Sequence, residues 1–341
     1  MSAYGRHVLK RLGQFALVVF IGVNITFLVT HATPIDPVEQ TIAAVTNFGS
    51  TSPDAIADMR SSLKALYGLE GNAWDQYSGF WRRVLVGDFG PSLSAFPTPV
   101  STLIGRALPW TIGLLLVSTV ISWTLGNLLG GLAGYYPRSR ALRLVGVIAM
   151  GLHPIPYYIV AFVLLIIFGF LWPVLPITGG SGMNVRQGLT VEFVVSVLRH
   201  SILPALSLVL VGLGSWFIGM RALVSNVVTE DYVTYAELAG VSKRRILGLY
   251  VMRNALAPQL TGLAMSLGAI FNGAIITEQV FGYPGIGTLL VEAVHKGDYS
   301  LVLGVTTVSI IAVASAVLII DLLAPVIDPR VRSSDAAGAR G

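Results

Sequence analysis

The residues with the clearest chemical potential form a short glycine-serine motif at residues 179–182 (GGSG). A serine becomes a nucleophile only when a base such as histidine lies within hydrogen-bond reach. His153 lies well upstream beside a proline, and His200 lies beside Arg199 at the edge of an apolar run. An intramembrane serine hydrolase that uses Ser181 is therefore one hypothesis, and a flexible loop at this motif is the one that the pattern favours.

Other catalytic and binding motifs are missing from the sequence. It contains no cysteine, so disulfides and thiolate chemistry are excluded. A Walker A loop needs lysine after glycine, and none of the four lysines follows one. Neither metal-ligand spacing nor a basic-aromatic pattern for nucleic acid occurs. We therefore expect no cofactor and no nucleic acid to bind this chain, and any ATP chemistry must lie in another polypeptide.

Two carboxylates, Glu278 and Asp321, stand near the ends of apolar stretches. An ionised group in hydrocarbon is costly, so Glu278 should face protein or water. With Phe281, Pro284 and Gly285 it forms a candidate gate or pathway segment. The alternative is that Glu278 reaches the membrane surface or caps a helix.

The strongly apolar composition indicates what kind of elements must position these residues. Of 341 residues, 54% are hydrophobic and only 11% are charged, whereas soluble domains carry about 25% charged residues. The exterior must therefore face lipid. We expect an all-α polytopic membrane protein.

Six apolar runs are long enough to span a bilayer as helices. The first is expected to be a retained helix and not a cleaved signal peptide. Pro154 and Pro156 predict a kink or break in the third run, and Gly126, Gly130 and Gly134 in the second predict close helix packing. The expected spans are residues 12–32, 110–133, 143–171, 203–223, 257–281 and 301–324.

The distribution of lysine and arginine predicts the orientation. Placing the N-terminus inside puts most of the 22 basic residues in the inside segments, as the positive-inside rule requires. Both termini are then cytoplasmic. Residues 33–109 lie outside, with a helix expected near residues 53–67, and residues 224–256 lie inside.

The inside loop at residues 228–250 has the most informative pattern. Val228, Tyr232, Tyr235 and Ala239 recur at helical spacing on one face, and Gly240 predicts a bend before a second, basic helix. Exposed aromatic residues mark interfaces, which favours a surface that docks into a groove on a soluble partner. The alternative is a solvated loop whose basic residues only set the topology. The residues that we expect to make this contact are Asp231, Tyr232, Thr234, Tyr235, Ala236, Glu237, Gly240, Lys243, Arg244 and Arg245.

Five motifs in the same order resemble those of permease subunits of binding-protein-dependent ABC importers, in the dipeptide/oligopeptide/nickel branch. The loop carries the third of them along the chain, although Thr234-Tyr235-Ala236 stands where the family has Glu-Ala-Ala. The resembling segments are residues 231–240 with 253–258 (DYVTYAELAG, RNALAP), 34–37 (PIDP), 87–93 (GDFGPSL), 278–287 (EQVFGYPGIG) and 328–332 (DPRVR).

The resemblance implies the type I ABC permease fold and a shared mechanism. Two permease subunits, expected to be a heterodimer, line one path. Each inserts a cytoplasmic coupling helix into one of two ATPase subunits, which use ATP and Mg, and an extracytoplasmic binding protein delivers the solute. The resemblance places the chain in the cytoplasmic (inner) membrane of a prokaryote.

The resemblance also implies a division of the chain and a set of solutes. Residues 1–97 are expected to hold the first helix and the extracytoplasmic segment, residues 98–328 the permease domain, and residues 329–341 a cytoplasmic tail. Peptides are the expected solute, with nickel complexes and oligosaccharides as alternatives. Secondary transport has support only from the Pro154/Pro156 interruption.

Overall fold

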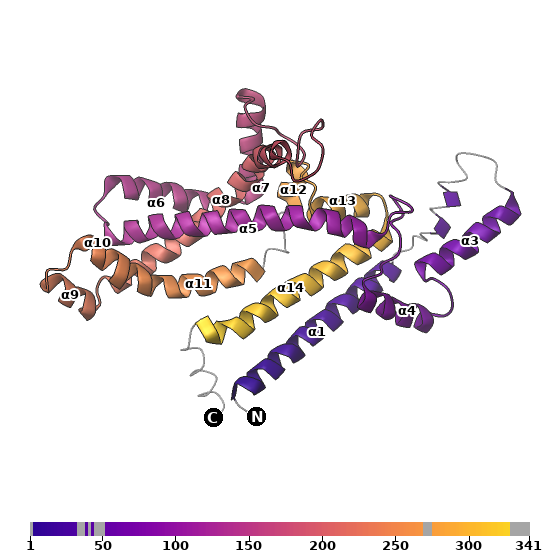
Figure 1. Ribbon diagram of the computed structural model, residues 1–341, viewed down its shortest axis with the longest axis horizontal. Coiled ribbons are helices and arrows are strands. Elements are labelled where there is room, and N and C mark those ends of the chain that lie inside the picture. Colours follow the sequence, from indigo (N-terminus) through magenta and orange to yellow (C-terminus); the bar gives the residue numbers. More distant parts are fainter. Residues whose placement is uncertain (1–2, 33–37, 40–41, 44–51, 269–274, 328–341) are drawn as a thin grey trace. The chain divides into compact units, whose positions relative to one another are not determined.

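A computed structural model describes residues 3–32, 38–39, 42–43, 52–268 and 275–327. Every regular element of four or more residues within these ranges is helical (Figure 1). The helices are α1 Ala3–Ala32, α3 Pro53–Tyr67, α4 Ala73–Val86, α5 Val100–Tyr135, α6 Arg140–Leu152, α7 Tyr157–Leu165, the π-helix η1 Ile166–Leu171, α8 Val191–Val227, α9 Asp231–Leu238, α10 Lys243–Arg245 (three residues), the π-helix η2 Ile246–Met252, α11 Arg253–Gly268, α12 Ile275–Val280, α13 Ile286–His295 and α14 Tyr299–Ile327.

Among the described residues, four helices are long and apolar enough to cross a bilayer, which confirms four of the expected spans. Their apolar windows lie in Gly5–Val29, Val100–Tyr135, Val191–Val227 and Tyr299–Leu322. The span expected at residues 257–281 includes residues 269–274, which lie outside the described residues. The motifs at residues 34–37 and 328–332, and the tail at 329–341, also lie outside them.

The third expected span is broken, as its two prolines predict. Between the helices Arg140–Leu152 and Tyr157–Leu171 the chain bends by 105°. Pro154 and Pro156 lie in the break, and Pro156 directly precedes the first residue of α7. Proline disfavours a helical conformation in the residue before it, so the chain changes direction here.

The chain forms two units, and each is discontinuous in sequence. The first comprises Met1–Val8, Ile112–Tyr283 and Ala316–Gly341, and the second comprises Leu9–Thr111 and Pro284–Ser315. The boundaries expected near residues 97 and 328 stay a prediction.

The first unit packs around α8. Gly126, Gly130 and Gly134 of α5 face α8, and a Cβ atom built on Gly130 would lie 2.4 Å from the carbonyl oxygen of Phe217. Side chains at these positions would separate the two helices, so glycine permits the close approach. Phe217 itself is fully buried beside Ala133 and Ala149.

The second unit is held by a buried carboxylate. Asp298 is fully buried, and its Oδ2 accepts hydrogen bonds from the Ser92 hydroxyl and from the Ser94 backbone and side chain, the last two at 2.9 Å. Its Oδ1 accepts from the Leu301 N–H at 3.0 Å, which caps the start of α14. Asp298 thus ties the segment after α4 to the N-terminal end of α14.

Candidate functional site: the helical loop after α8

The candidate site is the loop formed by α9, α10 and η2, which follows α8. Gly240 has φ +76°, in the left-handed region that favours glycine, and the Val241 N–H donates to the Ala236 carbonyl at 3.1 Å. This ends α9 and turns the chain towards α10. The two-helix arrangement with a glycine bend is confirmed, although η2, and not α10, forms most of the second arm.

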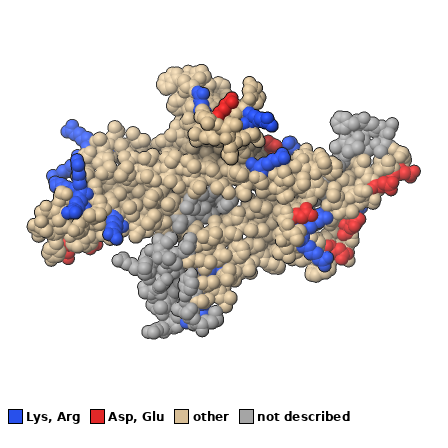
Figure 2. Space-filling model, in the orientation of Figure 1, with Lys and Arg blue, Asp and Glu red and all other residues tan. Residues whose placement is uncertain are grey.

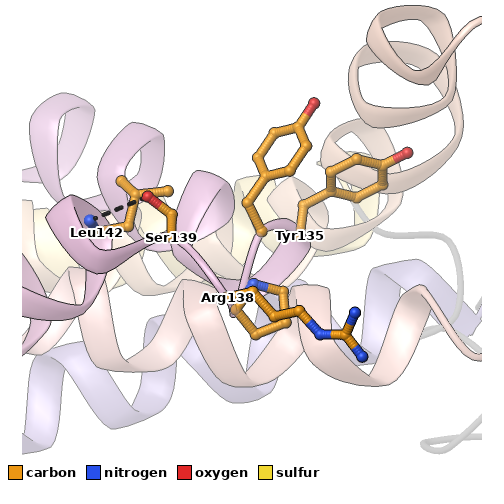
Figure 3. Close-up of a pocket in the computed structure, with 6 residues that line it drawn as sticks. Tyr135, Arg138, Ser139 and Leu142 are labelled. Atoms are coloured by element: carbon orange, nitrogen blue, oxygen red, sulfur yellow. Dashed lines mark hydrogen bonds between the residues drawn. The ribbon is translucent and has the colours of Figure 1, made fainter.

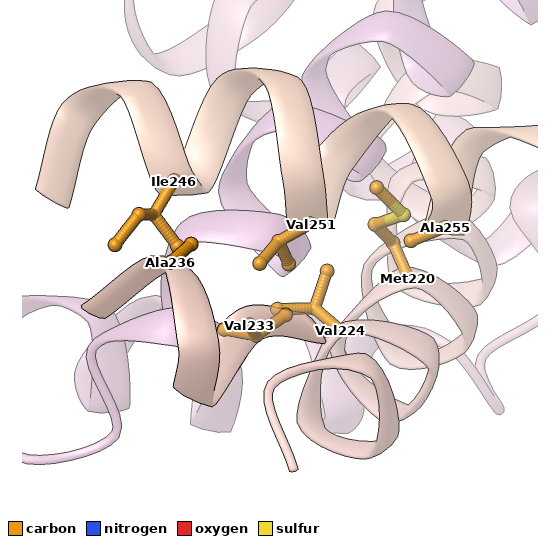
Figure 4. Close-up of a cluster of buried hydrophobic side chains, with 7 residues drawn as sticks. All are labelled: Met220, Val224, Val233, Ala236, Ile246, Val251 and Ala255. Atoms are coloured by element: carbon orange, nitrogen blue, oxygen red, sulfur yellow. The ribbon is translucent and has the colours of Figure 1, made fainter. Parts of the chain in front are cut away.

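One side of the loop is anchored in the first unit (Figure 4). Val233 and Ala236 of α9 are buried against Val224 of α8 and Val251 of η2. The full cluster of buried side chains comprises Met220, Val224, Val233, Ala236, Ile246, Val251 and Ala255. Four elements therefore share one core, and α9 cannot shift without disturbing α8 and α11.

The opposite side of α9 is exposed and apolar. Tyr235 is 69% exposed and Leu238 is 80% exposed, while Tyr232 is exposed to a smaller extent. The Asn254 side chain donates to the Tyr232 hydroxyl at 3.0 Å, which holds that ring in place. Of the stripe predicted from the sequence, Tyr232, Tyr235 and Ala239 are exposed, whereas Val228 precedes α9 and packs against the buried cluster.

Charged residues border this apolar face. Lys243, Arg244 and Arg245 are exposed, and basic side chains gather at the end of the first unit where α9 and α10 lie (Figure 2). Asp231, Thr234 and Glu237 are exposed on α9 itself. The surface thus combines an apolar centre with charges of both signs at its edge, as protein interfaces do.

Ala236 is the one expected contact residue that the structure buries. It is only 7% exposed and lies beside Ile246 in the buried cluster (Figure 4). Its place three residues after Val233 puts both on the anchored face. The signal in the sequence was the pair of small apolar residues on the face opposite Tyr232 and Tyr235.

A pocket of about 570 Å³ lies beside the loop, at the turn between α5 and α6 (Figure 3). Its lining residues are Tyr135, Tyr136, Pro137, Arg138, Ser139 and Leu142. Tyr135 also packs against the buried cluster of the loop. The Tyr135 hydroxyl and the Arg138 guanidinium point in different directions, so the polar groups do not converge on one ligand.

The candidate gate residues fall in both units. Glu278 and Phe281, in the first unit, are each 1% exposed. Pro284 and Gly285 begin the second unit's C-terminal portion, where Gly285 precedes α13. Glu278 is deeply buried, so it does not lie on an open face of the protein.

The segment after Glu278 is held by the loop between η1 and α8. The Gly179 N–H donates to the Phe281 carbonyl at 2.9 Å, and a Cβ on Gly282 would lie 2.7 Å from the Thr178 hydroxyl. The Tyr283 hydroxyl lies 3.0 Å from the Ser201 hydroxyl. Burial raises the pKa of the Tyr283 phenol, the Ser201 hydrogen bond opposes this, and the Glu278 charge adds to it, so the phenol stays protonated at neutral pH.

These contacts explain the glycine-serine motif without a nucleophile. Within the part of the chain that the structure describes, no hydrogen bond joins Ser181 to either histidine. His153 Nδ1 lies 3.1 Å from the Ser215 hydroxyl, and His200 Nδ1 donates to the Ser196 carbonyl at 2.7 Å. The serine hydrolase hypothesis therefore finds no support; within the motif, the Gly179 N–H donates to the Phe281 carbonyl and the Gly182 N–H donates to the Ser196 hydroxyl.

Asp298 was missed by the reasoning from sequence. Its signal was an acidic residue directly before a long apolar run, which is the pattern of a helix N-cap. The serines that it binds lie about 200 residues away, and local pattern reasoning does not pair such distant residues.

Known proteins with similar sequences match almost the whole chain. It is 24% identical to the dipeptide transport system permease protein DppB of Lactococcus lactis, over 96% of this chain and 99% of that protein. It is 28% identical to the oligopeptide transport system permease protein AppB of Bacillus subtilis, over 97% and 99%. It is 29% identical to the oligopeptide transport system permease protein OppB of Haemophilus influenzae, over 96% and 99%.

The family comparison covers the part of the chain that holds α8, the helical loop and the candidate gate. Residues 126–333 match the model of the binding-protein-dependent transport system inner membrane component. The resemblance inferred from five motifs is thereby confirmed. With its membrane-spanning helices and its anchored loop, the chain belongs to the family of inner membrane components of binding-protein-dependent transport systems.

Proposed function

We propose that this chain is the permease subunit of an ATP-driven importer of peptides, and that the loop of α9, α10 and η2 is its contact with an ATPase subunit. The observation that carries the proposal is that α9 has one buried face and one exposed apolar face. Its inner face is buried in the first unit, and its outer face presents Tyr235 and Leu238 to solvent.

The anchored side gives the loop its mechanical role. Force applied to α9 passes to α8 through Val224 and to α11 through Ala255, because these side chains share one close-packed cluster. Rigid-body movement of an ATPase subunit can therefore move the helices of the permease. The loop needs shape and anchorage for this, and no reactive group.

The assembly that we propose contains more chains. A second permease subunit, expected to be different in sequence, completes the pathway. Two ATPase subunits bind ATP and Mg, and an extracytoplasmic binding protein delivers the solute. Glu278, Phe281, Pro284 and Gly285 are proposed to shape the gate, and both termini are proposed to be cytoplasmic.

The relatives named above as dipeptide and oligopeptide permeases support peptides as the solute. Uptake of labelled dipeptides and longer peptides by cells with and without this chain tests whether peptides are the solute. If cells with the chain take up only nickel complexes or oligosaccharides, the assignment of the solute is wrong while the coupling proposal stands.

The coupling contact is tested by Leu238→Asp. A buried anchor at the centre of an interface contributes about 2 kcal/mol or more, so a carboxylate there should weaken ATPase binding at least ~30-fold. We expect peptide uptake to be lost while the amount of chain in the membrane is unchanged. Purified importer should then hydrolyse ATP without transport, or lose its ATPase subunits during purification.

Leu189→Asp is the matched control, because Leu189 is also fully exposed but lies in the loop before α8. It should leave uptake normal. Tyr235→Asp repeats the test at a second position of the same face. Normal uptake in both α9 variants would show that this face does not contact the ATPase.

A further inference from the structure

Helix α4 lies directly against α1 in the second unit. The Trp81 ring stacks on Phe20, with ring centroids 5.6 Å apart and planes at 19°. Tyr77 packs edge-on against Phe27 at 5.4 Å, and its hydroxyl donates to Asn24 Oδ1 at 2.7 Å. The contact therefore runs along two turns of α1, from Phe27 back to Phe20.

These positions of α1 lie within its membrane-spanning part. The candidate span is Gly5–Val29, and at 1.5 Å per residue Phe20 lies about 13 Å from the Val29 end. A helix of 25 residues is about 37 Å long, against a hydrocarbon core of about 30 Å. Centring the span in the bilayer places Phe20 about 10 Å inside the hydrocarbon, and Trp81 with it.

A second, independent mark also lies below the end of a spanning helix, at a smaller depth. Phe89 follows α4 by three residues, and a Cβ atom on Gly304 would lie 3.1 Å from the Phe89 ring. Gly304 is five residues into the candidate span Tyr299–Leu322, or about 7 Å below its first residue. The chain that leaves α4 is thus also below the end of a spanning helix.

The last turn of α4 has an exposed apolar surface. Leu85 and Val86, in its last turn, are 80% and 78% exposed, and no residue of α4 is buried. On α1 the neighbouring surface exposes Leu17, Phe20 and Ile21. The apolar surface of α4 is therefore continuous, through the Trp81–Phe20 stack, with a surface that a membrane helix presents to lipid.

The other end of α4 has the composition of a membrane-water interface. Asn72 and Asp75 form a capping box at its start, and Trp74 is 70% exposed in its first turn. Tryptophan is typical of the headgroup level. Arg82 is exposed, and its long side chain can extend towards the headgroups while its stem lies among acyl chains.

We propose that α4 is a lipid-binding helix that enters one bilayer leaflet obliquely beside α1, with Trp74 at the headgroups and with Leu85 and Val86 among phospholipid acyl chains. The segment at residues 33–109, expected from sequence to lie outside the membrane, is then partly embedded in it. The proposal rests on depth along α1 and α14, and holds whatever solute is carried.

The chain has no cysteine, which allows a sharp test. Leu85→Cys is labelled with a nitroxide in the assembled importer, reconstituted in phosphatidylcholine–phosphatidylglycerol vesicles. Collision with oxygen, which concentrates in acyl chains, is compared with collision with a water-soluble nickel chelate. Leu17→Cys on α1 serves as the lipid-facing control, and Ser62→Cys on α3, which is exposed, as the water-facing control.

We expect the oxygen-to-nickel accessibility ratio at Leu85→Cys to match that at Leu17→Cys and to exceed that at Ser62→Cys several-fold. Val86→Cys should behave in the same way and replaces Leu85→Cys if that variant fails to assemble. A ratio like that of Ser62→Cys would place α4 in water. A label that neither reagent reaches would place protein on this surface, and either result would overturn the proposal.

Discussion

Asp298 shows how much one side chain can organise in this protein. Its carboxylate is fully buried and accepts hydrogen bonds from Ser92, Ser94 and Leu301. Each of these donors is partly or wholly withdrawn from water, so removal of the acceptor leaves them unsatisfied.

Asp298→Ala should therefore destabilise the second unit. Loss of charged hydrogen bonds and of the α14 cap should cost about 3 kcal/mol. We expect a thermal unfolding midpoint several degrees lower in detergent, and faster proteolysis of the segment between α4 and α5. Asp58→Ala, at an exposed position of α3, is the control and should unfold as the unsubstituted protein does. Equal stability of the two variants would contradict the role given to Asp298.

For single residues, the sequence predicted the roles of those that depend on their neighbours along the chain. Gly240 was identified from its place between two amphipathic stretches, and its positive φ confirms the turn. The bonds of Asp298 were missed because its partners are distant in sequence, and the anchoring role of Ala236 was missed because it depends on how the neighbouring helices pack. Burial of Ala236 requires α8 and η2 to lie where they do.

Helix packing in the first unit depends on the α5 glycines. Gly130 faces the Phe217 backbone, whereas a Cβ atom on Gly113 of the same helix would meet nothing within 4 Å. The two positions share a helix but differ in their neighbours. They therefore separate the effect of packing from the effect of helix propensity.

Gly130→Ala should force α5 and α8 apart and destabilise the first unit by about 1–3 kcal/mol, the usual cost of overpacking. Gly113→Ala should be neutral or slightly stabilising, since alanine favours helix. Thermal inactivation of detergent-purified protein measures both. Equal inactivation temperatures for the two variants would show that α8 does not press on Gly130.

The positions of the long helices could be predicted from the sequence, but their lengths could not. Hydropathy located four spans and the prolines located the break between α6 and α7, but α5 runs for 36 residues and α8 for 37. Hydropathy detects the part that faces lipid, whereas backbone hydrogen bonding continues past it. Helix α4 was missed because its aromatic and charged residues have a low mean hydropathy, and only its contact with α1 reveals its surroundings.

The distribution of basic residues predicts how the whole molecule is oriented in the membrane. The loop of α9, α10 and η2 carries Lys243, Arg244 and Arg245, whereas α3 lies in the long segment after α1. The positive-inside rule then puts this loop in the cytoplasm and α3 on the opposite side. The coupling proposal requires the same orientation.

Single cysteines test this orientation in intact cells. Ser242→Cys, at an exposed position between α9 and α10, should react with a membrane-impermeant maleimide only after the cells are permeabilised. Ser62→Cys should react before permeabilisation. The unsubstituted chain has no thiol and gives the background. Labelling of Ser242→Cys in intact cells would place the loop outside and end the coupling proposal.

The bond between Ser92 and Asp298 has a consequence for biogenesis. The two residues are 206 positions apart in the chain. A ribosome that adds about 5–20 residues per second needs about 10–40 s to travel that distance. Throughout this interval the serines lack their acceptor, so the nascent second unit stays open to proteases and chaperones until Asp298 has been made.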